Sequence, residues 1–126
     1  MDDKKIVLAI DDNVQQLSEF KSILVPKYDL RAVKSASEAI GFLNKNNSDI
    51  ILLDIEMPNI SGFEFLEDIR KIPSYIAVPI IIVSGNSGPD FFNQARNSSA
   101  ADVLTKPVQP ETLIQTIEKA LAEVAD

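Results

Sequence analysis

The distribution of apolar positions along the chain predicts alternating strands and helices. Three short segments, residues 6–10, 50–53 and 80–83, are apolar at every position. Continuous apolar runs of this length are typical of parallel strands that are buried on both faces of a sheet. Two weaker segments, residues 30–33 and 102–105, bring the number of expected strands to five.

Between these segments, apolar residues recur at intervals of three and four, which is the spacing of one face of a helix. We expect five helices, over residues 14–24, 36–43, 63–72, 91–96 and 113–124. The fourth is short and follows residues 84–90, whose Gly, Ser and Pro content is typical of a loop. Its two aromatic residues, Phe91 and Phe92, are expected to anchor it in the core.

Several residues mark where these helices begin and end. Asn13 is placed to cap the first helix, and Ser35 with Glu38 has the pattern of a capping box at the second. Pro26 is expected to close the first helix, because proline does not continue a helix. Pro110 suits the first turn of the last helix. These signals agree with the boundaries that the periodicity indicates.

Strict alternation of strands and helices predicts an α/β fold, in which right-handed crossovers place helices on both faces of one parallel sheet. In such sheets, ligands bind beyond the carboxyl ends of the strands. The polar residues that fall at these ends are Asp11, Asp12, Asp54, Ser84 and Lys106. One edge of the sheet is therefore expected to collect every candidate for chemistry.

Composition narrows the choice of function. The chain has 126 residues with 45% apolar content, and one domain is expected over residues 1–126. A net charge of -7 weighs against direct binding to nucleic acid or anionic lipid. Without cysteine or histidine, the chain lacks the usual zinc ligands. No apolar run approaches the ~20 residues that span a bilayer, so a cytoplasmic location is expected.

The acids at the strand ends have several interpretations. Asp11 and Asp12 suit solvated loop positions, a helix N-terminus or a cation site, and Asp54 suits a cap or a functional carboxylate. If the three carboxylates lie together, their repulsion favours a divalent cation, and carboxylates with water suit Mg²⁺. A carboxylate at such a site can also be the nucleophile that accepts a phosphoryl group.

Lys106 and Ser84 can complete such a site. Lys106 would supply a second positive charge, and Ser84 would donate its hydroxyl to a phosphoryl oxygen. A cis peptide at Lys106–Pro107 would turn the chain sharply and aim the lysine inward. The simpler interpretations, a solvated lysine beside a loop proline and a plain turn at Ser84-Gly85, stay open at this point.

Taken together, these residues resemble the receiver domain of two-component response regulators, and the resemblance covers essentially the whole chain. The matching segments are Ile10-Asp11-Asp12-Asn13, Leu53-Asp54-Ile55-Glu56-Met57-Pro58 with Gly62, Val83-Ser84-Gly85 and Leu104-Thr105-Lys106-Pro107. The resemblance implies a flavodoxin-like, doubly wound sheet of five parallel strands in the order 2-1-3-4-5.

The same resemblance implies that Asp54 accepts a phosphoryl group from a sensor histidine kinase, a phosphotransfer protein or a small phosphodonor. It implies self-catalysed phosphotransfer and autodephosphorylation rather than a classical enzyme activity, and a downstream protein target. Lys106 would bind a phosphoryl oxygen, and Ser84 would move toward that group as the switch. The implied Mg²⁺ ligands are Asp12, Asp54 and the backbone carbonyl of Glu56, with Asp11 acting mainly through water.

Two positions depart from the family pattern. Val103 stands where the family usually has a Tyr or Phe that relays the signal, and Ser99 stands where it commonly has Gly. Glu56 and Asn86 are expected to flank the phosphoryl group and to tune its lifetime.

Two other functions compete with the phosphorylated switch. A receiver-fold module that binds proteins without phosphorylation is compatible with the missing aromatic residue. A small phosphatase with Asp54 as its nucleophile is disfavoured, because Asp54-Ile55-Glu56 is not the Asp-x-Asp motif of haloacid-dehalogenase-type phosphatases. Nucleotide binding is disfavoured too, because the sequence contains neither a G-x-x-x-x-G-K-[ST] nor a G-x-G-x-x-G motif.

Overall fold

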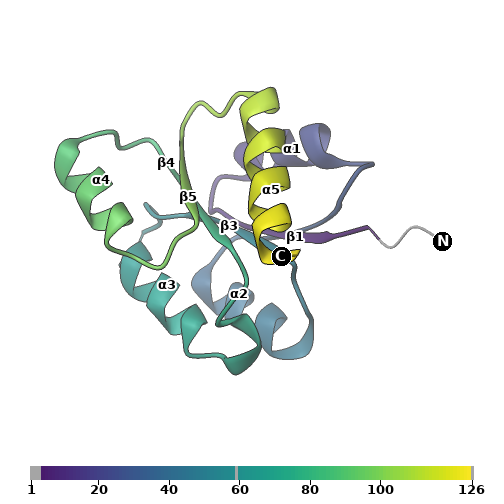
Figure 1. The fold of residues 1–126 in the computed structure, drawn as a ribbon, viewed down its shortest axis with the longest axis horizontal. Helices are drawn as coiled ribbons and strands as arrows, with labels where there is room; N and C mark the ends of the chain where they lie inside the picture. Colours follow the sequence, from purple (N-terminus) through teal and green to yellow (C-terminus); the bar gives the residue numbers. More distant parts are fainter. Residues whose placement is uncertain (1–3, 59, 126) are drawn as a thin grey trace.

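A computed structural model describes residues 4–58 and 60–125 and shows strands that alternate with helices (Figure 1). The strands are β1 (Ile6–Ile10), β2 (Asp29–Val33), β3 (Ile50–Asp54), β4 (Ile80–Ser84) and β5 (Asp102–Thr105). The helices are α1 (Val14–Leu24), α2 (Ala36–Lys45), α3 (Gly62–Arg70), α4 (Pro89–Arg96) and α5 (Pro110–Ala125), with a short 3-10 helix η1 (Pro73–Tyr75). Each predicted strand and helix is therefore present, with small shifts at the ends.

The five strands form one sheet in the order β2-β1-β3-β4-β5, and every neighbouring pair is parallel. This confirms the doubly wound, flavodoxin-like fold. In the observed register, Ile10 lies opposite Leu53, Asp54 opposite Val83, and Ser84 opposite Thr105. The carboxyl ends of β1, β3, β4 and β5 consequently meet at one edge of the sheet.

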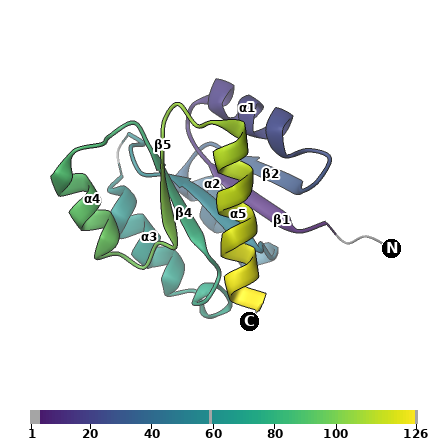
Figure 2. The same ribbon diagram turned by 45° about the horizontal axis from the view of Figure 1, so that its top comes forward.

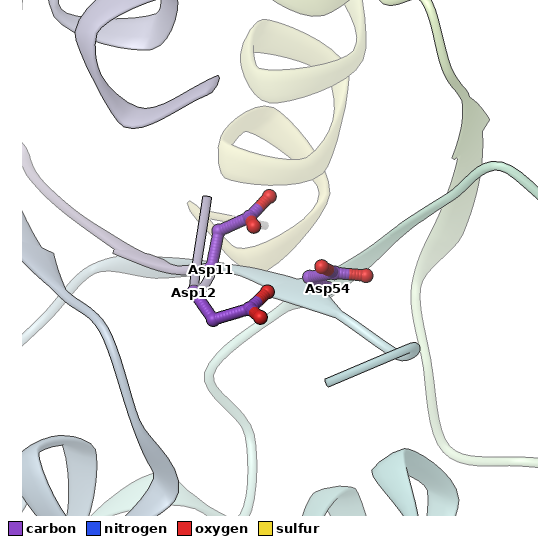
Figure 3. Close-up of side chains that lie close together, drawn as sticks. All are labelled: Asp11, Asp12 and Asp54. Carbon is purple, nitrogen blue, oxygen red and sulfur yellow. The ribbon is translucent and has the colours of Figure 1, made fainter. Parts of the chain in front are cut away.

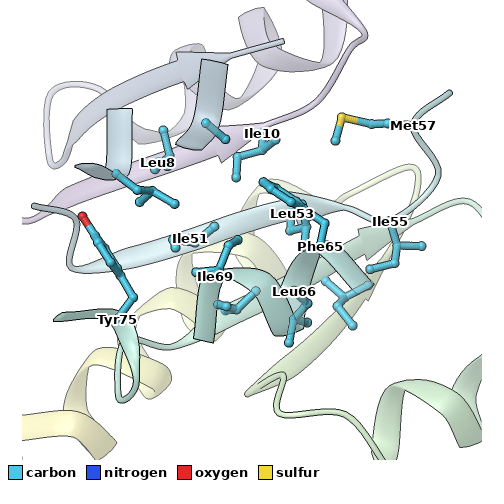
Figure 4. Packing of buried hydrophobic residues seen from close by; sticks show 14 of the residues in the cluster. Leu8, Ile10, Ile51, Leu53, Ile55, Met57, Phe65, Leu66, Ile69 and Tyr75 are labelled. Atoms are coloured by element: carbon cyan, nitrogen blue, oxygen red, sulfur yellow. The ribbon is translucent and has the colours of Figure 1, made fainter. Parts of the chain in front are cut away.

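Helices cover both faces of this sheet. Successive side chains of a strand point to opposite faces, so Leu8 and Ile10 join one core cluster while Val7 and Ala9 join the other. The first cluster includes buried residues of α2, α3 and α4, and Figure 4 shows part of it. The second includes residues of α1 and α5, the two helices that lie together in Figures 1 and 2. Burial on both faces accounts for the continuous apolar runs.

The helix start signals behave largely as expected. The side chain of Asn13 accepts a hydrogen bond from the Gln16 amide at 3.1 Å, and the side chain of Ser35 accepts one from the Glu38 amide at 3.1 Å. The Glu38 carboxylate accepts its return bond from the amide of Lys34, at 2.8 Å, and not from that of the cap residue itself. The first half of the capping box is therefore confirmed, and the second is shifted by one residue.

The expectation for the two aromatic residues of α4 is half wrong. Phe91 is buried, whereas Phe92 is 36% exposed. Both belong to one short helix that begins at Pro89. Phe91 belongs to the core cluster, whereas Phe92, about 100° further around a helix of 3.6 residues per turn, lies toward solvent.

Two further observations concern the backbone. The Lys106–Pro107 peptide bond is cis, as hypothesised, and so is Val25–Pro26. The latter follows the end of α1 at Leu24, which agrees with the predicted role of Pro26. Among the described residues, no helix is both long enough and apolar enough to cross a bilayer.

Candidate functional site

The predicted site residues lie where four parallel strands end. Asp11 directly follows β1, and Lys106 directly follows β5, while Asp54 and Ser84 are the last residues of β3 and β4. The apolar strands position these polar side chains, because every residue of β3 and β4 is buried. The sheet therefore brings the candidates together as the sequence predicted.

Three carboxylates form a cluster at this edge (Figure 3). Asp11, Asp12 and Asp54 each offer an oxygen, and these oxygens lie within 4.8 Å of one another. Asp11 and Asp54 are 1% and 4% exposed, whereas Asp12 is exposed to solvent. Negative charges this close repel one another, and the repulsion is strongest for the two buried groups.

Lys106 supplies the neighbouring positive charge. Its Nζ lies 3.1 Å from Asp11 Oδ2 and 3.4 Å from Asp54 Oδ2. The other oxygen of each carboxylate accepts a backbone amide: Asp11 Oδ1 from Asn13 at 2.9 Å, and Asp54 Oδ1 from Glu56 at 2.9 Å. Both buried aspartates are therefore oriented, with Oδ2 turned toward the lysine.

Burial and neighbouring charges change the acidity of this group. The pKa of Asp54 lies above its ordinary value, mainly because the carboxyl group is buried and also because Asp11 is negatively charged. The Glu56 amide and the Lys106 charge lower this pKa but do not cancel the effect of burial. Burial alone would lower the pKa of Lys106, but hydrogen bonds and charge from Asp11 and Asp54 outweigh it, so that pKa lies above its ordinary value. Lys106 is consequently a cation at neutral pH, and it faces the carboxylate with the raised pKa.

Ser84 is fully buried beside the cluster and has a partner that sequence reasoning missed. Its hydroxyl donates to Glu56 Oε1 at 2.8 Å, and the Gly85 amide donates to the same oxygen at 3.1 Å. The Asn86 amide donates to Ser84 Oγ at 3.0 Å. The sequence analysis placed Glu56 near the site but assigned no contact to its side chain, which reaches from the end of β3 to the end of β4.

The donor set fits a hard divalent cation. Mg²⁺ binds oxygen ligands and usually keeps several waters, so a few carboxylates at the rim of an exposed site suit it. Asp12 is exposed, and no backbone amide of the described residues donates to its carboxylate, whereas both oxygens of Asp11 and of Asp54 already have partners. Asp12 is therefore the best placed of the three to bind a cation directly.

The chain is similar in sequence to proteins that are already known. The family model described as the response regulator receiver domain matches residues 7–118. Protein PilH of Pseudomonas aeruginosa is 27% identical over 117 residues, which cover 92% of this chain and 97% of PilH. The CAI-1 autoinducer sensor kinase/phosphatase CqsS of Vibrio cholerae is 31% identical over 114 residues, which cover 88% of this chain but 16% of CqsS.

A solved structure shows the same architecture. The receiver domain protein of Methanospirillum hungatei, described as CheY-like, superposes with a TM-score of 0.88 at 27% identity, and the match covers 98% of each chain. The similarity thus extends over nearly all of two small proteins but over a minor part of a long sensor kinase.

Proposed function

This chain belongs to the response regulator receiver domain family, and from that premise we propose that it is a switch that accepts a phosphoryl group on Asp54. The observation that supports this most directly is the contact of Asp54 Oδ2 with Lys106, inside a cluster of three carboxylates. In this arrangement one oxygen of Asp54 is held by a backbone amide, and the other faces the cation. A carboxylate held in this way is a positioned nucleophile.

The proposed reaction is a direct transfer. Asp54 Oδ2 forms a bond to phosphorus while the bond from phosphorus to the donor breaks, and the donor leaves with the electrons of that bond. The donor is the phosphohistidine of a sensor kinase or phosphotransfer protein, or a small acyl phosphate. Water then hydrolyses the aspartyl phosphate, which restores the carboxylate of Asp54 and releases inorganic phosphate. Positioning and charge carry most of the catalysis in such transfers.

We propose that Asp12, Asp54 and the backbone carbonyl of Glu56 hold Mg²⁺, and that Asp11 acts through water. When bound, Mg²⁺ supplies positive charge against the phosphoryl oxygens. The exposure of Asp12 supports its direct role, whereas Asp11 accepts from Lys106 and the Asn13 amide, as Asp54 does from Lys106 and the Glu56 amide.

Lys106 and Ser84 are the proposed partners of the phosphoryl oxygens. Lys106 donates from the side of β5, and Ser84 and the Gly85 amide donate from the side of β4. Contacts that exist only in the phosphorylated protein would favour a second arrangement of α4 and β5, which is how a phosphoryl group shifts a conformational equilibrium.

The partners follow from the same proposal. The domain, residues 1–126, would receive its phosphoryl group from a histidine kinase or phosphotransfer protein and pass the signal to a protein target. CqsS, one of the relatives, is a sensor kinase/phosphatase by name, which agrees with such a pairing. The net charge of -7 supports a protein target over direct contact with nucleic acid. A cytoplasmic location stays a prediction.

Intact mass tests the proposal. We expect incubation with acetyl phosphate and Mg²⁺ to add the mass of one phosphoryl group to the wild type but not to Asp54→Asn. Asp68→Asn, which changes an exposed aspartate of α3, should be labelled like the wild type. If the wild type stays unlabelled while a control receiver is labelled, the proposal fails and the phosphorylation-independent interaction module takes its place.

A further inference from the structure

The side chain of Glu56 occupies the two donors that a phosphoryl oxygen on Asp54 would use. Glu56 Oε1 accepts the Ser84 hydroxyl at 2.8 Å and the Gly85 amide at 3.1 Å. Both donors lie at the end of β4, next to β3, which ends at Asp54. An anionic oxygen held by a hydroxyl and an amide is the arrangement expected for a bound phosphoryl oxygen, and here a carboxylate oxygen provides it.

The two anions cannot share these donors. A serine hydroxyl has one proton, and that of Ser84 already points to Glu56 while its oxygen accepts from the Asn86 amide. Ser84 is fully buried, so water does not readily replace a lost partner. A phosphoryl group and a carboxylate on the same donors would also repel each other.

The backbone holds Glu56 in place for this contact. Its amide donates to Asp54 Oδ1 at 2.9 Å, which fixes the start of the β3–α3 loop on the very residue that would be phosphorylated. The side chain itself is exposed, so it can swing into solvent without leaving a buried charge behind. Glu56 is therefore anchored by its backbone and free to release its carboxylate.

We propose that the Glu56 carboxylate is an intramolecular competitor of the phosphoryl group. In the unphosphorylated protein it holds Ser84 and Gly85, and it has to leave them when Asp54 carries a phosphoryl group. This inference rests on the proposed function. Glu56 is a positioning residue in this scheme, because it acts through Ser84 and Gly85, and it lowers the population of the state that can bind the phosphoryl oxygens.

Affinity for beryllium trifluoride in the presence of Mg²⁺ measures the competition without chemistry, because this anion binds a carboxylate as a stable analogue of a phosphoryl group. Amide signals of Gly85 and Lys106 in NMR spectra report the titration. We expect Glu56→Ala to bind on the order of tenfold more tightly than the wild type, since the two charge-assisted contacts with Ser84 and Gly85 no longer have to break. Glu56→Gln, whose amide oxygen is the weaker acceptor, should fall between them.

Two controls separate competition from a general effect of charge. Glu64→Gln removes the same charge from an exposed glutamate in the first turn of α3 and should leave the affinity unchanged. In a Ser84→Ala background, the gain from Glu56→Ala should shrink, because the main shared donor is gone. A gain of the same size in that background would overturn the proposal, since Glu56 would then act by charge alone.

The remaining outcomes are also decisive. Equal or weaker affinity in Glu56→Ala, with binding intact in the wild type, overturns the competitor role and leaves the proposed function standing. If neither protein binds the anion and neither is labelled by acetyl phosphate, the proposed function itself fails and this inference falls with it. Binding by Glu56→Ala alone would be the strongest support.

Discussion

Lys106 has different roles in the protein without ligands and in the proposed phosphorylated protein. In the described structure its ammonium group contacts Asp11 and Asp54, so it balances two buried carboxylates. The proposed Mg²⁺ would neutralise the same charges from the side of Asp12. The lysine and the metal therefore act against one another in binding, although both stabilise a bound phosphoryl group.

This opposition predicts the effect of Lys106→Met. Removing the ammonium charge should tighten Mg²⁺ binding roughly tenfold, because one competing cation is lost. The same change should slow labelling by acetyl phosphate about a hundredfold, because an oxyanion partner is lost. Calorimetry gives the first value and time-resolved intact mass the second, with Lys71→Met, at an exposed position at the end of α3, as the control. Weaker Mg²⁺ binding would contradict the argument.

Position 62 has no space for a side chain. A Cβ at this position would lie 2.6 Å from Ile55 Cα and would also collide with the Ile55 carbonyl oxygen. Because these are backbone atoms, no side-chain rotation relieves the collision. The glycine that begins α3 therefore lets the helix approach the loop that carries the proposed Mg²⁺ ligand.

We expect Gly62→Ala to lower the free energy of unfolding by about 1–3 kcal/mol through overpacking. Gly41→Ala is the matched control: it lies within α2 and its added Cβ meets nothing within 4 Å. This second change should stabilise the protein by roughly 0.5–1 kcal/mol, because alanine favours a helix. Urea unfolding monitored by circular dichroism measures both, and equal effects would refute the spatial argument.

Residues at strand ends were predictable because their position depends on the backbone alone. Once five parallel strands are assigned, Asp54, Ser84 and Lys106 have to meet at one edge of the sheet. The contact of Glu56 with Ser84 was not predictable in this way. It depends on how far one side chain reaches across two strand ends, and no spacing along the chain encodes that reach.

At the scale of elements, Arg70 joins α3 to three other segments. Its guanidinium group donates to Ser99 Oγ and to the Ser99 carbonyl, both at 2.9 Å, and to the Tyr75 carbonyl at 2.8 Å, and it also donates to the carbonyl of Val78. Ser99 stands where the family commonly has Gly, and its hydroxyl oxygen accepts one of these hydrogen bonds. Arg70 connects the end of α3 with η1, with the segment between η1 and β4, and with the loop before β5.

Arg70→Met should keep most of the apolar stem but lose these bonds and leave carbonyl groups without a donor. We expect the free energy of unfolding to fall by about 2–3 kcal/mol. Arg96→Met, at an exposed arginine at the end of α4, should stay within about 0.5 kcal/mol of the wild type. Chemical denaturation compares the two, and similar values for both variants would show that the bonds of Arg70 add little.

An aromatic contact connects α3 with α4. The ring centroids of Phe63 and Phe91 are 6.0 Å apart, and those of Phe91 and Phe92 are 5.5 Å apart. Val103, which replaces the usual aromatic of β5, is half-buried against the core cluster that contains Phe91. A movement of α4 would therefore displace α3 through the contact between Phe63 and Phe91. On the side of β5, only the small side chain of Val103 is available to transmit such a movement.

Truncating each aromatic of α4 tests this packing. Phe91→Ala should cost about 3–5 kcal/mol, as for large core residues. Phe92→Ala should cost less than about 1 kcal/mol, because its ring is already partly exposed. The pair is matched in chemistry and adjacent in sequence, so thermal unfolding of the two variants reports burial directly. Equal losses would mean that Phe92 is as important to the core as Phe91.

At the scale of the whole molecule, the kind of fold was predictable and the order of its strands was not. Continuous apolar runs separated by helical periodicity require a parallel sheet with covered faces. They do not determine which strands are neighbours, because several orders bury the same residues. The order 2-1-3-4-5 came from the resemblance to receivers, and the structure confirms it. Local sequence patterns encode strands and helices, whereas the order of the strands in the sheet depends on the complete chain.

The charge of the whole molecule connects the proposed metal site to stability. The chain carries a net charge of -7, and three of its carboxylates lie within one cluster. Folding therefore has to overcome repulsion that a bound divalent cation would relieve. A ligand that binds only the folded state at ten times its Kd adds about 1.4 kcal/mol to stability, which corresponds to several degrees in Tm for a domain of this size.

We therefore expect millimolar Mg²⁺ to raise the Tm of the wild type, measured by scanning calorimetry at constant ionic strength. Asp12→Asn should lose most of this increase, because it removes the exposed ligand. Without Mg²⁺ the same variant should melt at or slightly above the wild-type temperature, since one repelling charge is gone from the cluster. Asp68→Asn, at an exposed position on α3 outside the cluster, should keep the full response. If Mg²⁺ raised the Tm of Asp12→Asn as much as that of the wild type, the stabilisation would come from general screening of the acidic surface, and the three carboxylates would not be a metal site.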